Sequence, residues 1–320
     1  NAILARSGAN QSLIREAQAA GLAVGIINSG HIAEPGSGVF LASSRRRDDY
    51  PGIAKTILES GADVILAGGE IYLLPAGVTG RHGSAGVRPD GLDLIAAARA
   101  AGYTVVFDRA ELLAAAADPA TTRLLGVFAA TDTFNYDTEE KLAAAGLPLY
   151  LPQAPDVADM TRAALQVFER IGRRFLLVVE EEGTDNFANR YHAAGTFEAL
   201  RRADAAIGVA RTFLARHPDT LILTAADSDA GALQIVDFGL QRDPDEPAPV
   251  LPPLTKIGTP LDGRAGTGTP AFLSAPNAQG HRSWFGVSWG APDDVIGGVV
   301  ARAAGRNAHR LRVNLDNTQL

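Results

Sequence analysis

The sequence predicts an α/β fold with a mostly parallel central sheet and helices on both faces. Short apolar runs of strand length alternate with helical stretches along most of the 320 residues. Runs such as residues 175–179 (FLLVV) are continuously apolar, which is typical of strands buried on both faces of a parallel sheet. Several of these runs end in acidic or glycine-rich loops, where open α/β sheets carry their sites.

The elements can be justified in order along the chain. Residues 10–21 place Leu13, Ile14 and Ala17 at helical spacing before Gly21. Asp156 precedes an amphipathic stretch and is a suitable N-cap for it. Further helices are predicted at 50–60, 92–101, 110–117, 157–171 and 194–216, and strands at 22–27, 63–67, 103–107, 124–129, 175–179, 221–226, 285–289 and 295–301.

The segments that connect the predicted helices and strands are rich in glycine and proline. Residues 71–90 and 148–155 are predicted as loops, and Gly68-Gly69 as a tight turn. Residues 240–282 are predicted to form a long surface excursion. No GxGxxG follows a strand, so a dinucleotide site has little support. We expect residues 1–320 to form a single domain.

Composition excludes several classes of function. The chain is 46% hydrophobic and 20% charged, as is ordinary for a globular protein, and its formal net charge is −7. An acidic balance with only one arginine cluster argues against nucleic acid as a partner. No apolar run reaches the ~18 residues of a membrane span, and the absence of cysteine excludes thiol chemistry. The chain starts at Asn1 without a visible signal peptide, which predicts a segment of a longer protein.

Two apolar runs are each followed directly by acidic residues. Residues 175–179 lead into three glutamates, 180–182, and then Asp185. Residues 221–226 lead into Asp227, Ser228 and Asp229. Adjacent carboxylates repel one another and are costly to bury without cations. The two stretches therefore predict a metal site with oxygen ligands, with a solvated acidic turn as the alternative for Glu181 and Glu182.

Several short pieces occur together in a specific order, from about Asn10 to Asn317. They are residues 33–35 (AEP), 43–45 (SSR), 63–69 (DVILAGG), 179–180 (VE) followed by Asp185, 221–227 (LILTAAD) and 316–318 (DNT). In this order and spacing the chain resembles the alkaline phosphatase family. The resemblance implies an α/β/α sandwich that hydrolyses phosphate monoesters, with a serine nucleophile, two close cations and a third nearby.

The resemblance also implies roles for individual residues. Glu180 matches the glutamate of the third, magnesium-type ion, and Glu34 stands where the family usually has a threonine ligand of that ion. Asp185 matches a ligand of the first catalytic ion, and Asp227 a ligand of the second. Arg45 matches the arginine that forks onto the phosphoryl oxygens, with Arg46 and Arg47 as alternatives by a small register shift.

Three positions depart from the family pattern. Asn189, Ser228 and Asp294 stand where the resemblance implies histidines. Since imidazole suits zinc and oxygen ligands suit harder ions, we expect Mg²⁺, with Ca²⁺ or Mn²⁺ as alternatives to the family's Zn²⁺. Asn189 and Ser228 could instead hydrogen-bond a ligand carboxylate. The remaining alternatives are Asp229 as a ligand or turn residue, Asp293 in place of Asp294, His192 as a substitute imidazole, and His31 as a phosphate contact or surface-loop residue.

The nucleophilic serine of the family would lie upstream of Asn1. The sequence therefore predicts a metal-dependent phosphate monoester hydrolase whose serine is not in this segment, so the segment alone is expected to be inactive. The alternatives are another hydrolase of the same superfamily fold, such as a phosphodiesterase or sulfatase, a phosphomutase, or a cation-dependent binding protein without catalysis. A periplasmic or extracellular location and a homodimer are further implications of the resemblance.

Overall fold

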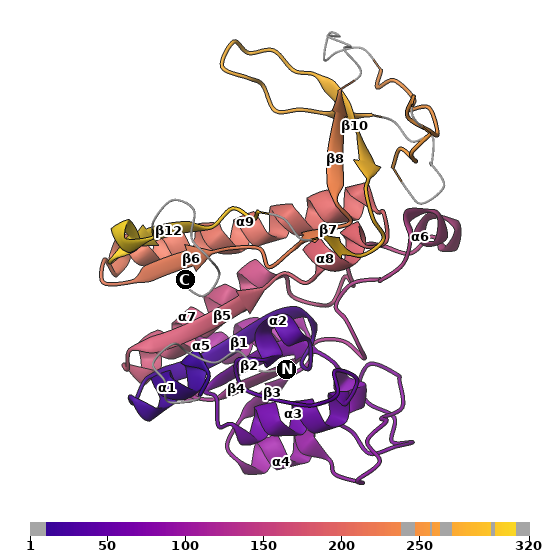
Figure 1. Ribbon diagram of the computed structural model, residues 1–320. Helices are drawn as coiled ribbons and strands as arrows, with labels where there is room; N and C mark the ends of the chain where they lie inside the picture. Colours follow the sequence, from indigo (N-terminus) through magenta and orange to yellow (C-terminus); the bar gives the residue numbers. More distant parts are fainter. Residues whose placement is uncertain (1–10, 238–246, 257, 263–270, 296–297, 312–320) are drawn as a thin grey trace.

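The computed structural model describes residues 11–237, 247–256, 258–262, 271–295 and 298–311. Its centre is a sheet of five parallel strands in the order β3-β4-β2-β1-β5 (Figure 1). The strands are β1 (Ala23–His31), β2 (Val64–Gly68), β3 (Thr104–Val106), β4 (Leu124–Val127) and β5 (Phe175–Glu180). The predicted α/β fold with a parallel sheet is confirmed.

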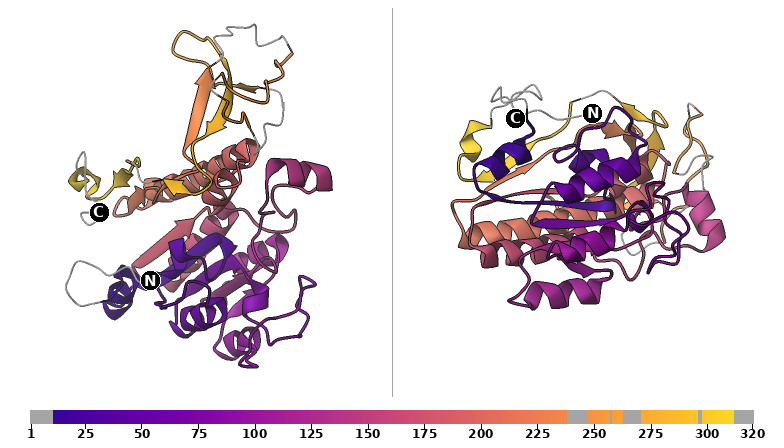
Figure 2. Two further views of the ribbon diagram at one scale, coloured as in Figure 1. Left: turned by 45° about the vertical axis from the view of Figure 1, so that its right-hand side comes forward. Right: turned by 90° about the horizontal axis from the view of Figure 1, so that it is seen from below.

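Helices cover both faces of this sheet because its apolar side chains alternate between the faces. On β1, Val24 and Ile26 join a core with α1 (Leu13–Ala19), α3 (Tyr50–Glu59) and α4 (Leu94–Ala100). Ala23 and Ile27 face the opposite core, with α5 (Arg109–Ala117) and α7 (Val157–Ile171). The two helical layers are visible in Figure 2, and they form the predicted α/β/α sandwich.

Most of the predicted helices are present in the structure. The side chain of Asp156 accepts a hydrogen bond from the Asp159 backbone N–H, 2.7 Å away, and so caps α7 as predicted. The long helix α9 (Ala193–Arg216) packs on α7 and on the short α8 (Gly183–Ala188). Three α-helices of the described residues were not predicted: α2 (Pro35–Gly38), α6 (Glu139–Ala145) and α8. Within the described residues, no helix is both long and apolar enough to cross a membrane.

Two strand predictions need correction. The run at 175–179 forms β5, but β5 is the edge strand and is mostly half-buried rather than buried on both faces. The run at 221–226 forms β6 (Leu221–Thr224), which lies outside the central sheet and pairs antiparallel with β12 (Arg302–Gly305). The side chains of Leu221 and Leu223 are 52% and 47% exposed. An apolar run predicts a strand but not its partners, so burial could not be inferred from it.

The later part of the chain builds smaller sheets beside α8 and α9. Strands β8 (Leu233–Asp237), β9 (Phe272–Leu273) and β10 (Trp284–Trp289) form an antiparallel sheet that projects from the sandwich (Figure 1). A second pair joins β7 (Asp229–Ala230) to β11 (Asp294–Val295). Of the strand predicted at 295–301, only Val295 lies in a strand, β11; positions 298–301 form none, and 296–297 lie outside the described residues.

Residues 240–282 were predicted as a surface excursion. Their described part is mainly loop, yet Leu251 and Leu261 are buried at 3% and 0% exposure. Positions 240–246, 257 and 263–270 of this segment lie outside the described residues, as do 1–10 and the 316–318 motif.

Candidate metal-binding and active site

Titratable side chains gather at the carboxyl edge of the parallel sheet. Strands β1, β4 and β5 end at this edge, and the loops that follow them turn inward there. The short β7–β11 pair brings the ends of two later loops to the same region, because Asp294 is paired with Ala230. The residues concerned are His31, Glu34, Asp132, Glu180, Glu181, Glu182, Asp185, Asp227, Ser228 and Asp294; we call the carboxylates among them the acidic site.

Glu180, the last residue of β5, lies at the centre of the acidic site. Its Oε2 accepts a hydrogen bond from the side-chain amide of Asn28 at 2.5 Å. Burial first, and then the charges of Glu34 and Asp227, raise the pKa of Glu180 to about 8. A Cβ added at Gly36 would lie 1.5 Å from Glu180 Oε1, so the first turn of α2 touches this carboxylate directly.

Glu181 is an anchored residue rather than part of a solvated turn. Its Oε1 accepts hydrogen bonds from Ser29 Oγ at 2.6 Å, Tyr150 Oη at 2.8 Å and the Gly183 N–H at 3.2 Å. Burial nevertheless raises its pKa to about 7, and Oε2 is buried without a hydrogen-bond partner. These contacts tie the end of β5 to β1.

Glu182 is equally buried, at 8% exposure, and it faces its neighbours' charges. Burial raises its pKa well above the ordinary value, and Glu180, Glu34 and Asp185 raise it further. The solvated-turn alternative is therefore wrong for both Glu181 and Glu182. At this edge several carboxylates therefore repel one another.

A bridge of hydrogen bonds connects α8 to the β7–β11 pair. Asn189, at the end of α8, donates from Nδ2 to Asp185 Oδ1 at 2.9 Å and to Asp294 Oδ1 at 3.0 Å. Burial raises the pKa of Asp185 to about 7, with a further rise from its contact with Asp294. The pKa of Asp294 lies below its usual value, first because Asn189 donates to it, and Ser228 also hydrogen-bonds it. These contacts match the alternative in which Asn189 and Ser228 orient ligand carboxylates.

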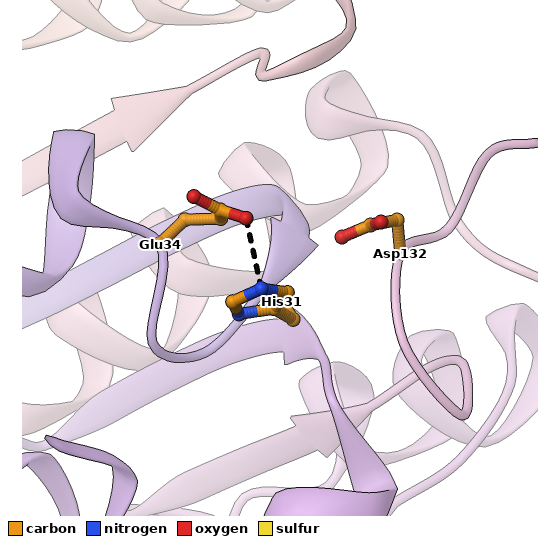
Figure 3. A group of neighbouring side chains, drawn as sticks. All are labelled: His31, Glu34 and Asp132. Carbon is orange, nitrogen blue, oxygen red and sulfur yellow. Dashed lines mark ion pairs between the residues drawn. The ribbon is translucent and has the colours of Figure 1, made fainter. Parts of the chain in front are cut away.

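The end of β1, the loop that follows it and the loop after β4 bring together His31, Glu34 and Asp132 (Figure 3). His31 Nε2 lies 2.8 Å from Glu34 Oε1, and one donor atom of each residue lies within 4.8 Å of the other two. Burial raises the pKa of Asp132 to about 6. His31 is only 5% exposed, so its interpretation as a surface-loop residue is wrong.

The three arginines at 45–47 lie in different surroundings. Arg45 is exposed and makes no hydrogen bond or ion pair with the part of the chain that the structure describes. Arg46 is paired with Asp48 at 2.8 Å on the surface. The charge of Arg47 instead reaches the acidic site: it contributes to the lowered pKa of Asp294, after Asn189, and it opposes the burial that raises the pKa of Tyr50.

An aromatic wall stands beside His31. The ring centroids of Tyr50 and Tyr72 lie 4.8 and 4.9 Å from that of His31. Tyr72 belongs to the short helix η1 (Glu70–Tyr72), which follows the tight turn predicted at Gly68-Gly69; Gly69 has a φ of 97°, which favours glycine. The wall therefore depends on the loop after β2 as well as on α3.

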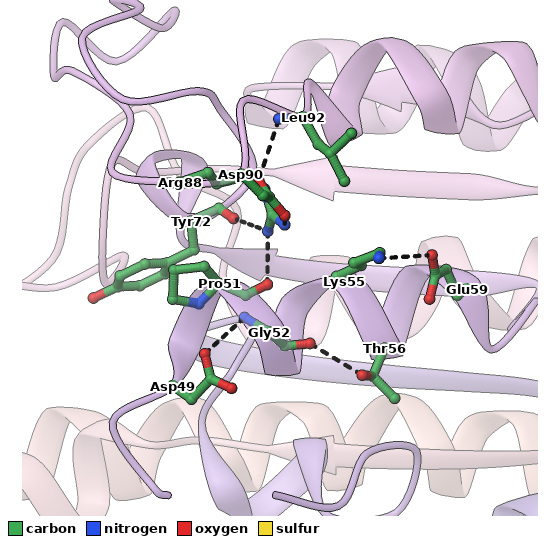
Figure 4. A network of polar contacts seen from close by, with 10 residues as sticks. All are labelled: Asp49, Pro51, Gly52, Lys55, Thr56, Glu59, Tyr72, Arg88, Asp90 and Leu92. Atoms are coloured by element: carbon green, nitrogen blue, oxygen red, sulfur yellow. Dashed lines mark hydrogen bonds and ion pairs between the residues drawn. The ribbon is translucent and has the colours of Figure 1, made fainter.

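Buried Arg88 holds this wall in place (Figure 4). Its Nη1 donates to the carbonyl oxygens of Pro51 at 2.6 Å and Tyr72 at 3.0 Å, and its Nε donates to Asp90 at 3.1 Å. The side chain is 1% exposed. One guanidinium thus joins the start of α3 to the loop at 71–92.

Several residues of this region were not recognised from the sequence. Asp132 and Asn28 were missed because neither lies in a charge run, and only the parallel pairing of β1 with its neighbours brings them to the edge. Asp227 lies near Glu180 and Asp185, since its charge raises the pKa of both, but it is exposed and follows β6 rather than a buried strand. Asp185 likewise belongs to α8 and not to a strand end.

His192, which was considered as a substitute imidazole, is the N-cap of α9 in the structure. It is 4% exposed, and its Nδ1 accepts the Gly195 N–H at 3.1 Å as the N-cap of α9. The same atom lies 3.6 Å from Glu139. Burial lowers its pKa. Asp229 and Asp293 are exposed, and the roles considered for them stay predictions.

The fold and the edge site can be compared with known proteins. The alkaline phosphatase of the Antarctic bacterium TAB5 superposes on 93% of this chain and 69% of its own with a TM-score of 0.64; at 14% identity this likeness concerns the fold alone. The crystal structure of Thermus thermophilus alkaline phosphatase covers 70% of this chain and 43% of its own, with 31% identity and a TM-score of 0.57. Both neighbours define an α/β phosphatase fold.

The sequence comparisons identify the family. The family model for alkaline phosphatase matches residues 3–241, and the chain therefore belongs to the alkaline phosphatase family. Streptomycin-6-phosphate phosphatase of Streptomyces griseus is 30% identical over 202 residues, 58% of this chain and 43% of that protein. Alkaline phosphatase of Escherichia coli is 26% identical over 271 residues, 75% of this chain and 54% of that protein. The chain thus spans about half the length of these curated relatives.

Proposed function

We propose that this chain carries most of the cation- and phosphate-binding site of a metal-dependent phosphate monoesterase. Family membership supports a phosphatase-type hydrolase. The observation that carries the proposal is the mutual repulsion at the acidic site, where Glu34, Glu180 and Asp185 each raise the pKa of buried neighbours. A protein keeps such a cluster ionised at neutral pH most readily when divalent cations neutralise it.

The residues present fit hard divalent cations. Asp132 Oδ1 and Glu181 Oε2 are buried oxygens without hydrogen-bond partners. Most donors at the site are carboxylates, which suit Mg²⁺, Mn²⁺ or Ca²⁺ better than Zn²⁺. Glu34, Glu180, Asp185, Asp227 and Asp294 would hold the ions. Bound cations would supply the positive charge that stabilises the attacking and leaving oxygens of phosphoryl transfer.

Asn189 and Ser228 would serve as positioning residues. Asn189 holds Asp185 and Asp294 at a fixed separation through its two hydrogen bonds, and its own Oδ1 accepts the Gly231 N–H at 3.1 Å. The bridge therefore keeps the α8 carboxylate aligned with the one that β11 carries. This arrangement replaces the imidazoles that the resemblance implies.

Arginine at 45–47 would bind the phosphoryl group, and Arg47 has the better position. Its charge acts on Asp294 and Tyr50, at the rim of the acidic site. A guanidinium can donate two parallel hydrogen bonds to phosphoryl oxygens. The Streptomyces relative is named for a phosphate ester, streptomycin-6-phosphate, which favours small phosphate monoesters as substrates here.

The nucleophile would be a serine contributed by chain that precedes Asn1. The outer edge of β5 has no strand partner in the part of the chain that the structure describes, and Glu180 lies at its end. An additional strand there would end beside the acidic site, since parallel strands end at the same edge. A periplasmic or extracellular location and a homodimer are proposed with the function, on family grounds only.

The test uses the natural full-length protein, stripped of metal with a chelator. Hydrolysis of p-nitrophenyl phosphate is measured after Mg²⁺, Mn²⁺, Ca²⁺ or Zn²⁺ is restored separately. We expect turnover to return with Mg²⁺ or Mn²⁺ and to be lost in an Asp185→Asn variant.

Three outcomes would contradict parts of the proposal. Best recovery with Zn²⁺ would overturn the choice of ions. Turnover of a phosphodiester or sulfate ester with none of the monoester would move the protein to another hydrolase class. Tight cation binding without turnover of any ester would instead support a cation-dependent binding protein.

A further inference from the structure

We infer that His31, Glu34 and Asp132 form a cation site of their own, with one imidazole nitrogen and two carboxylate oxygens, selective for a divalent transition-metal ion such as Mn²⁺ or Zn²⁺. The inference rests on the proposed function, because Glu34 and Asp132 belong to the acidic site, and it deepens that function by adding His31 as an imidazole ligand to these two carboxylates. Figure 3 shows the two carboxylates pointing toward each other above the His31 ring.

The geometry of the three side chains is the first support. Their donor atoms lie within 4.8 Å of one another, a spread that one ion with ligand bonds of about 2.0–2.2 Å can close by small rotations. His31 ends β1 and Glu34 follows it by three residues, whereas Asp132 comes from the loop after β4, so the order of the sheet brings Asp132 to the other two. His31 and Glu34 are only 6% and 12% exposed at their side chains.

Unsatisfied buried atoms are the second support. Asp132 Oδ1 is buried and has no hydrogen-bond partner in the described part of the chain, which is unfavourable for a carboxylate unless a cation reaches it. His31 Nδ1 is also buried without a partner, so the imidazole makes its only polar contact through Nε2. The ring is nine-tenths buried and aims Nε2 at the gap between the two carboxylates.

The aromatic wall keeps the imidazole in this orientation. Tyr50 and Tyr72 both meet the His31 ring at 67°, an edge-to-face arrangement in which an aromatic face can receive a ring N–H. A metal ligand must present a lone pair at one nitrogen and keep its proton on the other. The wall therefore restricts the rotation of an imidazole whose Nε2 lies 2.8 Å from Glu34 Oε1.

The donor set distinguishes this site from the rest of the acidic site. Carboxylates alone favour Mg²⁺ or Ca²⁺, whereas an added imidazole favours first-row transition ions. Glu34 can serve both groups, since its Oε1 contacts His31 while its charge also raises the pKa of Glu180. The alternative without a metal is a protonated imidazole that neutralises the two carboxylates.

Mn²⁺ is the probe, because pulsed electron paramagnetic resonance detects nitrogen bound to it. The metal-free natural full-length protein is titrated with Mn²⁺ alone. We expect a bound ion with ¹⁴N coupling from one imidazole. His31→Gln should abolish the coupling, and Asp132→Asn should weaken Mn²⁺ binding at this site about tenfold or more. Zn²⁺ should displace this Mn²⁺ at lower concentration than Mg²⁺ does.

Two matched variants control the experiment. His281→Ala removes an exposed histidine far along the chain and should leave the ¹⁴N coupling unchanged. Glu182→Gln alters the carboxylates near Glu180 but should keep the coupling, and circular dichroism checks that each variant is folded. Mn²⁺ bound without ¹⁴N coupling, or coupling that survives in His31→Gln, would overturn the inference.

Failure of this inference differs from failure of the proposed function. Coupling in a protein that hydrolyses no ester would retain the site and reject the phosphatase. Turnover restored by Mg²⁺ with no nitrogen-bound Mn²⁺ would retain the phosphatase and reject the site.

Discussion

Arg45, Arg46 and Arg47 are adjacent in sequence and differ in what their side chains meet. Arg46 is occupied by Asp48, and Arg45 points to no partner among the described residues. The charge of Arg47 acts within the acidic site, where it contributes to the lowered pKa of Asp294. A register derived from family spacing cannot resolve a shift of two residues in a loop, whereas side-chain surroundings can.

The first prediction concerns phosphate binding by these arginines. Arg47→Ala should weaken inhibition of the full-length enzyme by inorganic phosphate about tenfold or more, because a hydrogen bond to a charged group contributes about 1.5–3 kcal/mol. Arg46→Ala, whose partner is Asp48, should change the inhibition constant little. A loss in Arg45→Ala with Arg47→Ala unaffected would restore the assignment made from the sequence.

The second prediction concerns the contact between Gly36 and Glu180. Gly36→Ala places a methyl group where Glu180 Oε1 now lies, so the carboxylate must move away from Asn28. We expect the stabilisation of the folded protein by added Mg²⁺, measured as a rise in melting temperature, to shrink markedly.

Gly208→Ala is the matched control for that substitution. Gly208 is exposed within α9, and an added Cβ meets nothing within 4 Å. Alanine there should raise stability by about 0.5–1 kcal/mol, as expected in a helix interior. An unchanged Mg²⁺ effect in Gly36→Ala would show that Glu180 does not hold the ion.

At the scale of elements, the loop after β2 is connected to α3 by one buried side chain. Arg88 donates to carbonyl oxygens from both, while Asp90 takes its remaining donors (Figure 4). The wall of Tyr50 and Tyr72 stands on these two segments. The loop is therefore fixed by specific hydrogen bonds rather than by a regular element of its own.

The third prediction follows from this connection. Arg88→Ala removes a buried guanidinium that donates to the carbonyl oxygens of Pro51 and Tyr72 and to Asp90, so the free energy of unfolding should fall by about 2–4 kcal/mol. Arg46→Ala breaks an ion pair whose Arg46 side chain is 75% exposed and should leave the free energy of unfolding almost unchanged. Urea unfolding monitored by circular dichroism measures both; equal small losses would mean that Arg88 does not hold the wall.

At the scale of the whole molecule, the acidic site couples stability to pH. Burial raises the pKa of Glu180 to about 8 and those of Glu181 and Asp185 to about 7, whereas unfolded carboxyls have values of about 4. Between these values the folded protein holds more protons than the unfolded one. Its stability therefore falls as pH rises from about 4 through 8.

The fourth prediction is the effect of cations on this fall. In the presence of a chelator, the melting temperature should decrease between pH 5 and pH 8. The free energy of unfolding should fall over this range by about 1.4 kcal/mol per pH unit for each proton that the folded protein retains. Saturating Mg²⁺ or Mn²⁺ should make this fall smaller, because the ions bind the ionised site. At a hundredfold excess of the ion over Kd, binding should add about 2.7 kcal/mol to the free energy of unfolding. Glu180→Gln should flatten the profile without metal. A melting temperature that rises over this range in chelator would contradict the repulsion described here.

The sequence by itself determined the alternation of strands and helices, the N-cap at Asp156 and the family. These features depend on local periodicity, capping residues and ordered motifs, all of which are written in consecutive residues. It also located the glutamates after β5, because a charge run after an apolar run is visible without any partner.

Only the tertiary structure decided which side chains meet. Asp132 and Asn28 reach Glu34 and Glu180 because β1 lies between β2 and β5, a pairing that no local pattern encodes. For the same reason, the sequence did not show that β6 lies outside the central sheet, because an apolar run specifies a strand and not its neighbours. Burial, and with it the pKa of every carboxylate at the site, is set by contacts between residues far apart in the chain.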